Sequence, residues 1–147
     1  MKEWKKDPVM ELIVETDPAA TVELESEIGH VKMIPFKGTV RGPLFTGIIE
    51  PCGVDTQVTN QVDVRHMSAR YMLTGTDCAG QSCHIYVDNN AFFTGGDRPR
   101  PWHSKPLFMT DSKTLAPILH RNQFIGQGMR EEDGFLHIRV FQVEVAE

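Results

Sequence analysis

The feature of this sequence that most constrains its fold is a series of short segments whose residues alternate between two sides. In segment 21–28, for example, Val22 and Leu24 fall on one side of an extended chain, whereas Glu23 and Glu25 fall on the other. This two-residue period predicts half-buried β-strands. Further strands are expected at 9–16, 30–36, 44–50, 56–59, 62–74, 83–88, 107–110, 123–130 and 135–145. Short strands at such regular spacing predict a β-sandwich or a β-barrel.

Turn-forming residues separate many of these segments. They are Lys37-Gly38, Arg41-Gly42-Pro43, Pro51-Cys52-Gly53, Ala79-Gly80 and the stretch 131–134. Only one segment has a helical pattern, and Pro117 inside it limits the expected helix to a turn or two near residues 112–121. The sequence therefore predicts an all-β fold, a closed antiparallel β-barrel of about eight or more strands with one short helix.

Length and charge restrict the class of protein. A chain of 147 residues fits one domain, which we place at 9–147 after an N-terminal tail at 1–8. A net charge of -5 argues against nucleic acid as a partner, because binding to phosphates needs clustered Lys and Arg. The charged N-terminus is followed by no apolar stretch, and no segment has the length of a membrane span. We therefore expect no membrane partner and a cytoplasmic location.

The cysteines and histidines indicate no metal site. Three cysteines without a secretory signal are typical of reduced thiols, although Cys78 and Cys83 flank an expected hairpin turn and an oxidised bridge between them is the alternative. The histidines lack ligand spacing, so no metal is predicted. Strand alternation that gathers His66, His84 and His137 is the alternative there.

The stretch 62–90 predicts a β-hairpin with its turn near Ala79. In that register Leu73 lies opposite Ile85, and Arg70 lies opposite Asp88. One face of the hairpin is apolar and consists of Met67, Ala69, Tyr71, Leu73, Cys83, Ile85 and Val87. The other face is polar and carries His66, Ser68, Arg70, Met72, Thr74, His84, Tyr86 and Asp88.

Two interpretations of the polar face remain open. It is either the solvent side of an ordinary amphipathic hairpin or the lining of a wet internal pocket. We favour the pocket, because the polar side of segment 21–28 uses glutamate whereas this face uses histidine, tyrosine and arginine. An Arg70–Asp88 pair in such a pocket would hold the guanidinium in one orientation.

Segment 94–106 is rich in glycine and proline, and it contains the isolated Trp102. This composition predicts a loop rather than a central strand. Long loops on a rigid scaffold often carry function, so one interpretation is a lid or binding loop. The other is a surface excursion whose Trp102 packs against the rim of the barrel.

Several strings, in their order and spacing, resemble one family. They are Ile34-Pro35-Phe36-Lys37-Gly38, Gly42-Pro43, Gly47, Pro51-Cys52-Gly53-Val54-Asp55, Met67-Ser68-Ala69-Arg70-Tyr71-Met72-Leu73, Thr76-Asp77 and Ile85-Tyr86-Val87, with the region 108–126 and the closing strand. The chain resembles domain-of-unknown-function family 3237 over nearly its whole length. This resemblance implies an antiparallel β-barrel similar to allene oxide cyclase and dirigent barrels, and it implies a fold more firmly than a function.

The chain departs from the usual pattern of that family at two places. Cys52-Gly53-Val54-Asp55-Thr56 stands where the family usually has Gly-Gly-Ala-Asp-Trp, so the acid is kept and the aromatic residue is lost. Ser68-Ala69-Arg70-Tyr71 stands where the family often has Asp-Ala-Arg-Tyr. An acid or base at position 68 is therefore missing from this chain.

In a barrel of this kind, a carboxylate and an arginine facing one cavity predict binding of an enolate or a carboxylate ligand, in which the acid takes a proton and the cation stabilises the negative charge. We expect Asp55 and Arg70 to be catalytic; the alternative for Asp55 is a turn carboxylate that binds backbone amides. The expected ligand-binding residues are His66, His84, Tyr86, Asp88 and Trp102. The expected activity is that of a cofactor-independent isomerase, cyclase or lyase acting on a small hydrophobic carbonyl compound.

The rival hypothesis is a module without catalytic activity. In that case the barrel carries a ligand, or its outer apolar positions form an interface within an oligomer. A small-molecule ligand and a homo-oligomer are the expected partners. An open cavity in which polar groups converge would favour chemistry, whereas a lumen filled by apolar side chains would favour a structural role.

Overall fold

The structure of the chain is a computed structural model that describes residues 2–145, and most of these residues lie in β-strands. The strands are β1 (Lys2–Trp4), β2 (Met10–Thr16), β3 (Val22–Ser26), β4 (Gly29–Arg41), β5 (Phe45–Asn60), β6 (Val64–Asp77), β7 (Ser82–Thr94), β8 (Trp102–Thr110), β9 (Phe124–Arg130) and β10 (Leu136–Val145). A 3-10 helix spans Pro18–Ala20, and the short helix α1 spans Ala116–Leu119.

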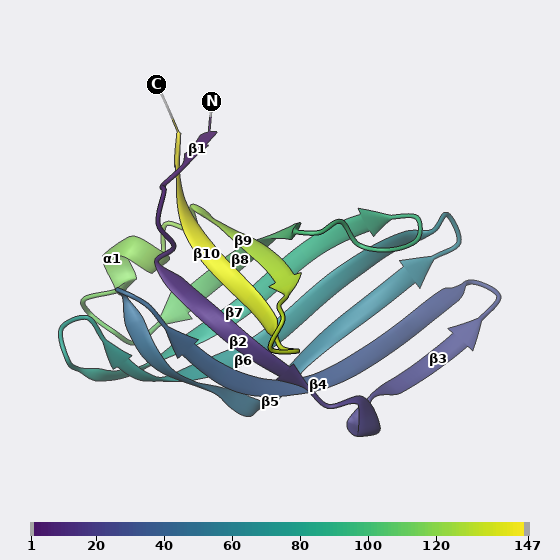
Figure 1. The fold of residues 1–147 in the computed structure, drawn as a ribbon, viewed down its shortest axis with the longest axis horizontal. Helices are drawn as coiled ribbons and strands as arrows, with labels where there is room; N and C mark the ends of the chain where they lie inside the picture. The colour runs from purple at the N-terminus through teal and green to yellow at the C-terminus, as the bar shows by residue number, and fades with distance from the viewer. Residues whose placement is uncertain (1, 146–147) are drawn as a thin grey trace.

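The strands close into an antiparallel barrel (Figure 1). The ring runs β10, β2, β4, β5, β6, β7, β8 and β9, and the pairing of β9 with β10 closes it. Two strands lie outside the ring: β1 pairs with the end of β10, and β3 pairs with the first part of β4. The predicted closed antiparallel barrel with one short helix is confirmed. Lys2–Trp4, which we placed in an N-terminal tail, form β1.

Two expected turns are bulges inside long strands. At Lys37-Gly38 the register of β4 against β5 shifts between Phe36 and Gly38, and at 51–53 the register of β5 against β6 shifts between Ile49 and Val54. A residue at Gly38 with a Cβ would overlap the carbonyl oxygen of Ile13 on β2. Glycine and proline therefore bend these strands without ending them, which is why the pattern resembled turns.

The predicted β6–β7 hairpin is confirmed in its register. Leu73 pairs with Ile85, Tyr71 pairs with Val87, and Arg70 pairs with Asp88. Its apolar face points into the barrel and is buried with the inward side chains of the other strands. This core includes Met10, Leu12, Val40, Phe45, Ile49, Leu73, Ile85, Val87, Leu115, Leu119 and Val140.

The prediction that 94–106 is a loop holds only for its first part. Trp102–Ser104 pair with β9, and Lys105–Thr110 pair with β7, so β8 exchanges one neighbour for the other near Pro106. Pro106 has no backbone N–H to donate to a neighbouring strand. It fits at this position because the pairing of β8 with β9 has ended there. The expectation that the segment contains no strand inside the sheet was therefore wrong for 102–106.

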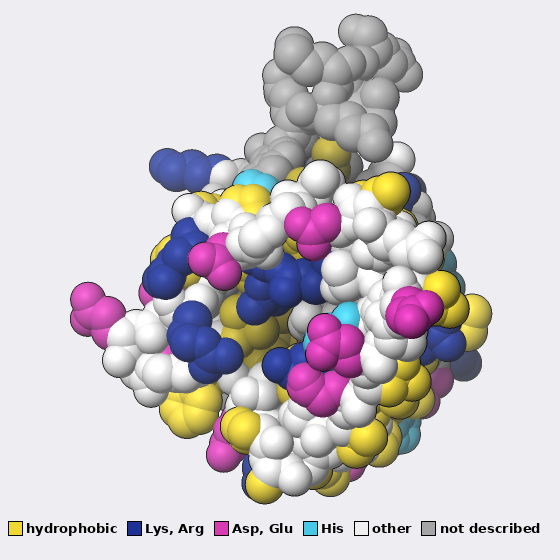
Figure 2. All heavy atoms as spheres, turned by 90° about the vertical axis from the view of Figure 1, so that its right-hand side faces the viewer, with side chains coloured by type: hydrophobic (Ala, Val, Ile, Leu, Met, Phe, Trp, Pro, Cys, Tyr) yellow, Lys and Arg dark blue, Asp and Glu magenta, His cyan; other side chains and the backbone are white. Residues whose placement is uncertain are grey.

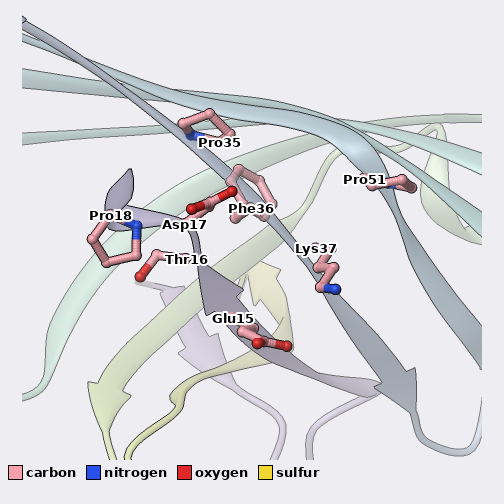
Figure 3. Close-up of a pocket in the computed structure, with 8 residues that line it drawn as sticks. All are labelled: Glu15, Thr16, Asp17, Pro18, Pro35, Phe36, Lys37 and Pro51. Carbon is pink, nitrogen blue, oxygen red and sulfur yellow. The ribbon is translucent and has the colours of Figure 1, made fainter. Parts of the chain in front are cut away.

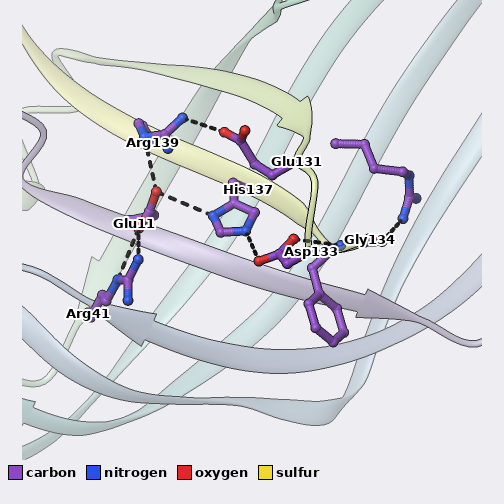
Figure 4. Close-up of polar contacts among 9 residues, drawn as sticks. Glu11, Arg41, Glu131, Asp133, Gly134, His137 and Arg139 are labelled. Carbon is purple, nitrogen blue, oxygen red and sulfur yellow. Dashed lines mark hydrogen bonds and ion pairs between the residues drawn. The ribbon is translucent and has the colours of Figure 1, made fainter.

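An ionic network lies across the seam between β2, β4 and β10, on the outer surface of the barrel (Figure 4). At its centre, Glu11 accepts hydrogen bonds from Arg41 at 2.7 Å and contacts Arg139 at 3.0 Å and His137 at 3.4 Å. His137 also contacts Asp133 at 2.7 Å. Burial favours a higher pKa for Glu11, but the hydrogen bonds from Arg41 and His137 and the positive charges outweigh it and lower the pKa.

The variant Glu11→Gln is expected to lower the free energy of unfolding by about 1–2 kcal/mol at neutral pH, because three donors lose a charged acceptor. Because folding lowers the pKa of Glu11, the charged carboxylate stabilises the folded protein at pH values above the pKa that Glu11 has in the unfolded chain. This stabilisation is lost as the pH falls through the lower pKa of the folded protein. Urea unfolding at neutral and acidic pH checks this. Glu15→Gln on the same strand, where Glu15 is exposed, is the matched control. A constant difference between the two variants down to low pH would contradict the prediction.

The structure also bears on membrane-spanning helices and on the state of the cysteines. Within residues 2–145, no helix has the length and hydrophobicity that crossing a membrane requires. Cys52, Cys78 and Cys83 all lie in this described range and carry free thiols, with Cys78 exposed and Cys83 buried.

Candidate functional site

The face of the hairpin that we expected to line a pocket lies on the outside of the barrel. Arg70 has 68% of its side chain exposed, and its Nε lies 3.9 Å from Asp88 Oδ2. Tyr86 is exposed as well. The favoured inward orientation of this face was wrong, because the alternate residues Met67, Ala69 and Tyr71 fill the interior instead.

The two histidines of this face have local partners. His66 Nε2 lies 3.0 Å from Asn90 Oδ1, and its ring stacks on Phe92. His84 Nδ1 lies 3.0 Å from Asp111 Oδ2 at the surface. His137 belongs to the network around Glu11, and the described part of the chain has no group of three His, Cys, Asp or Glu side chains placed to hold a metal ion.

Two other predicted residues, Asp55 and Trp102, do face the interior. Both line a small cavity of about 30 Å³ in the lumen. The other lining residues are Val14, Thr16, Phe36, Met67, Ala69, Tyr71, Asn89, Arg98, Leu136 and Ile138. By volume, this space admits about one or two water-sized groups. The lumen is thus largely filled by side chains, with a polar recess at one place.

Asp55 lies in the middle of β5, opposite Ile34 on β4 and Ala69 on β6. The interpretation of Asp55 as a turn carboxylate was therefore wrong. Its Oδ2 accepts a hydrogen bond from Gln57 Nε2 at 2.8 Å, whereas the buried Oδ1 has no hydrogen-bond partner among the described residues. Burial raises the pKa of Asp55 above its ordinary value, against the hydrogen bond from Gln57 and the positive charges of Arg98 and Arg65.

Tyr71 and Asn89 add polar groups to the same recess. Tyr71 is buried edge-on against Phe36, with ring centroids 5.2 Å apart. Burial, and then the negative charge of Asp55, raise the pKa of the Tyr71 phenol, so this group stays protonated. The side chain of Asn89 is buried, and its Oδ1 has no partner within the described range. Gly53 makes this packing possible, because a Cβ there would press on the rings of Phe36 and on Tyr71.

Arg98 is the site residue that the sequence reasoning missed. It comes from the loop between β7 and β8, and its guanidinium lies 5.0 Å above the ring of the buried Trp102. Burial lowers the pKa of Arg98, and the neighbouring charges of Arg65 and Arg130 lower it further, whereas Asp55 raises it. The charge of Arg98 therefore interacts with the carboxylate of Asp55 and with two other cations. The glycine- and proline-rich composition of 94–106 was the only sequence signal for this loop.

The recess opens into a wider mouth at one end of the barrel. A cavity of about 210 Å³ there shares Thr16, Asp55, Arg98 and Leu136 with the inner cavity, and it also contacts Lys32, Gln57 and Arg130. Figure 2 looks onto this side of the molecule and shows a hollow with a hydrophobic floor, surrounded by Lys and Arg side chains and by some Asp and Glu side chains. The polar recess is therefore accessible from outside.

A larger groove of about 510 Å³ lies beside the 3-10 helix and contacts Pro18, Pro35, Phe36 and Pro51 (Figure 3). Its charged groups are Glu15, Asp17 and Lys37, which are all exposed to solvent. Unlike Asp55, none of these three groups is enclosed by the barrel. Enclosed polar groups are a better sign of chemistry than volume, so the recess around Asp55 is the stronger candidate site.

Comparison with known proteins gives a family and a fold. The model of the family described as "Protein of unknown function (DUF3237)" matches residues 5–143. A UPF0311 protein from Clostridium acetobutylicum is 29% identical over 98 residues, which cover 66% of this chain and 60% of that protein.

Three solved structures have a similar fold. A protein with unknown function from Clostridium acetobutylicum aligns with a TM-score of 0.75 and 21% identity, covering 97% of this chain and 100% of that one. A conserved protein of unknown function from Rhodopseudomonas palustris gives 0.74 and 20% identity, over 97% and 99% of the two chains. A β-barrel-like protein from Acinetobacter baumannii gives 0.72 and 20% identity, over 98% and 97%. At this level of identity the similarity shows the fold alone.

Proposed function

Because the chain belongs to the DUF3237 family, whose description assigns no activity, we propose a function from the geometry of the barrel itself. The protein binds a small carbonyl compound at the mouth of the barrel and moves a proton on it with Asp55. The reaction class is a cofactor-independent isomerisation, cyclisation or elimination that passes through an enolate.

One observation carries this proposal: a buried carboxylate with an unpartnered Oδ1 faces a cavity that is open to solvent through the mouth. A buried polar atom without a partner is costly, so proteins keep few of them without a functional reason. A raised pKa brings a carboxyl group closer to the range in which a general base works best near neutral pH. Asp55 therefore supplies the base.

The groups around Asp55 suit the charge that develops on the substrate. When Asp55 removes a proton from the carbon next to a carbonyl, negative charge accumulates on the carbonyl oxygen. Arg98, held over Trp102, is the cation of the recess that stabilises this oxygen. The protonated phenol of Tyr71 is a further candidate hydrogen-bond donor in the same cavity. The small inner volume admits only the reacting end of the substrate.

A binding experiment tests the proposal before any reaction is known. We expect compact ketones such as 2-pentanone and methyl levulinate to raise the melting temperature, because ligands that bind only the native state stabilise it. The variant Ala69→Leu puts a larger side chain into the inner cavity and should abolish this shift. Ser68→Leu, on the outward face of the same strand, is the matched control and should retain it. If Ala69→Leu folds and still responds as the wild type does, the ligand does not occupy the recess and the proposal fails.

A further inference from the structure

The mouth of the barrel gathers positive charge in a chain whose net charge is -5. Lys32, Arg98 and Arg130 line the cavity above Asp55. Arg98 and Arg130 also line an adjoining cavity of about 300 Å³, together with Arg100. The lowered pKa of Arg98, caused first by burial and then by the charges of Arg65 and Arg130, fits this crowding of cations around one opening.

These mouth cations differ from the arginines elsewhere on the barrel. Arg41 and Arg139 are neutralised by Glu11 and Glu131 in the network of Figure 4. In contrast, Lys32, Arg98 and Arg130 form no ion pair with any residue of the described range. Asp55 lines the same cavity and Asp97 lines the adjoining one, so negative charge balances these cations only in part. The remaining repulsion between like charges costs stability unless an anion joins them.

Aromatic rings hold Arg98 and Arg65, a neighbouring cation whose charge acts on Arg98. The guanidinium of Arg98 lies 5.0 Å from the centroid of Trp102, and that of Arg65 lies 5.3 Å from the centroid of Phe93. Both rings belong to buried side chains of the lumen, so neither guanidinium needs a carboxylate to fix its position. Arg130 is oriented by a hydrogen bond of 2.6 Å from its Nη1 to the carbonyl of Gly134. Contacts within the chain therefore hold Arg65, Arg98 and Arg130 in place.

We infer that the compound bound by the barrel is a small keto acid, whose carboxylate lies at the mouth between Lys32 and Arg130 while its carbonyl end enters the recess between Asp55 and Arg98. This inference rests on the proposed function and narrows its substrate class. The two cavities meet at Asp55 and Arg98, so one molecule can occupy both. The mouth cavity is small for a ligand site, which restricts the acid to a compact one.

The probes for this inference are levulinate, which has a ketone and a carboxylate, and its uncharged methyl ester. Isothermal titration calorimetry at low ionic strength should show that levulinate binds about tenfold more tightly than methyl levulinate. Added salt should reduce this preference, because part of the attraction is screened.

Two variants locate the anion site. Lys32→Gln and Arg130→Gln are each expected to weaken levulinate binding about fivefold and to leave methyl levulinate binding unchanged, as for a partly exposed charge pair. Their matched controls are Lys105→Gln on the outer face of β8 and Arg121→Gln beside α1, where both side chains are exposed. Lys32 is the primary position, because Arg130 also holds a turn and its replacement can perturb folding.

The outcomes separate the two proposals. Equal affinity for acid and ester, or a Lys32→Gln variant that binds levulinate as tightly as Lys105→Gln does, overturns the inference. Binding of the ester to the recess, abolished by Ala69→Leu, then still supports the proposed function. If neither compound binds at the recess, both proposals fail together.

Discussion

Replacing Asp55 by asparagine is expected to lower the rate of proton exchange at the α-carbons of bound levulinate by about 10²–10⁴-fold, the usual contribution of a general base. The amide has nearly the same shape and can still accept a hydrogen bond from Gln57, but it cannot take up the proton. Exchange is measured in D₂O by the loss of the α-proton signals in NMR spectra. Asp88→Asn, on the outer face of β7, is the control and should exchange as the wild type does.

The pH dependence gives this variant a second readout. Exchange by the wild type should rise as pH increases through the raised pKa of Asp55 and then level off, whereas Asp55→Asn should lack this titration. Because folding raises the pKa of Asp55, its protonated form stabilises the folded protein at low pH. This stabilisation is lost as the pH rises through the pKa that Asp55 has in the folded protein. Asp55→Asn should consequently be no less stable than the wild type at neutral pH. An unchanged exchange rate in a folded Asp55→Asn protein would refute the assignment.

Replacing Trp102 by alanine is expected to lower the free energy of unfolding by about 3–5 kcal/mol, the usual cost of removing a large buried aromatic side chain. The ring is 3% exposed, packs edge-on against Phe93 and supports Arg98. Gly128 on β9 leaves the space that the indole occupies, because a Cβ there would overlap it. Unfolding in guanidinium chloride, followed by far-UV circular dichroism, measures the difference.

The control for this prediction is Trp102→Phe, which keeps an aromatic ring below Arg98. It should lose less stability than the alanine variant and should retain more of the affinity for levulinate. If alanine costs under about 1 kcal/mol, the indole is not the packed element that its burial indicates.

The β6–β7 hairpin shows how far the sequence could predict this molecule. Alternation and turn chemistry set the pairing of Arg70 with Asp88, because both depend on residues close together in the chain. The choice of the inner face depends on the whole barrel. Apolar side chains are usually buried, and Met67, Ala69 and Tyr71 do lie inside the barrel. We instead expected the polar face to point inward, so Arg70 was assigned to the wrong side.

The candidate site was predictable only in part for a similar reason. Asp55 could be named from the sequence because the string Cys52-Gly53-Val54-Asp55-Thr56 keeps the acid of the pattern that it resembles. Arg98 could not, because its proximity to Asp55 joins a loop to a strand more than forty positions away in the chain. No local pattern encodes such a contact. The bulges at Gly38 and Gly53 escaped prediction because glycine in a strand and glycine in a turn look alike in one sequence.

The position of β3 outside the ring has a consequence for self-association. The ring pairs most of the backbone of its own strands, whereas β3 pairs with β4 and its other edge is free, so another polypeptide could add there as a further strand. Its apolar Val22 and Leu24 are exposed and would favour such growth. The intervening Glu23 and Glu25 place negative charges that repel an identical strand laid alongside, which protects the protein from polymerising into fibres.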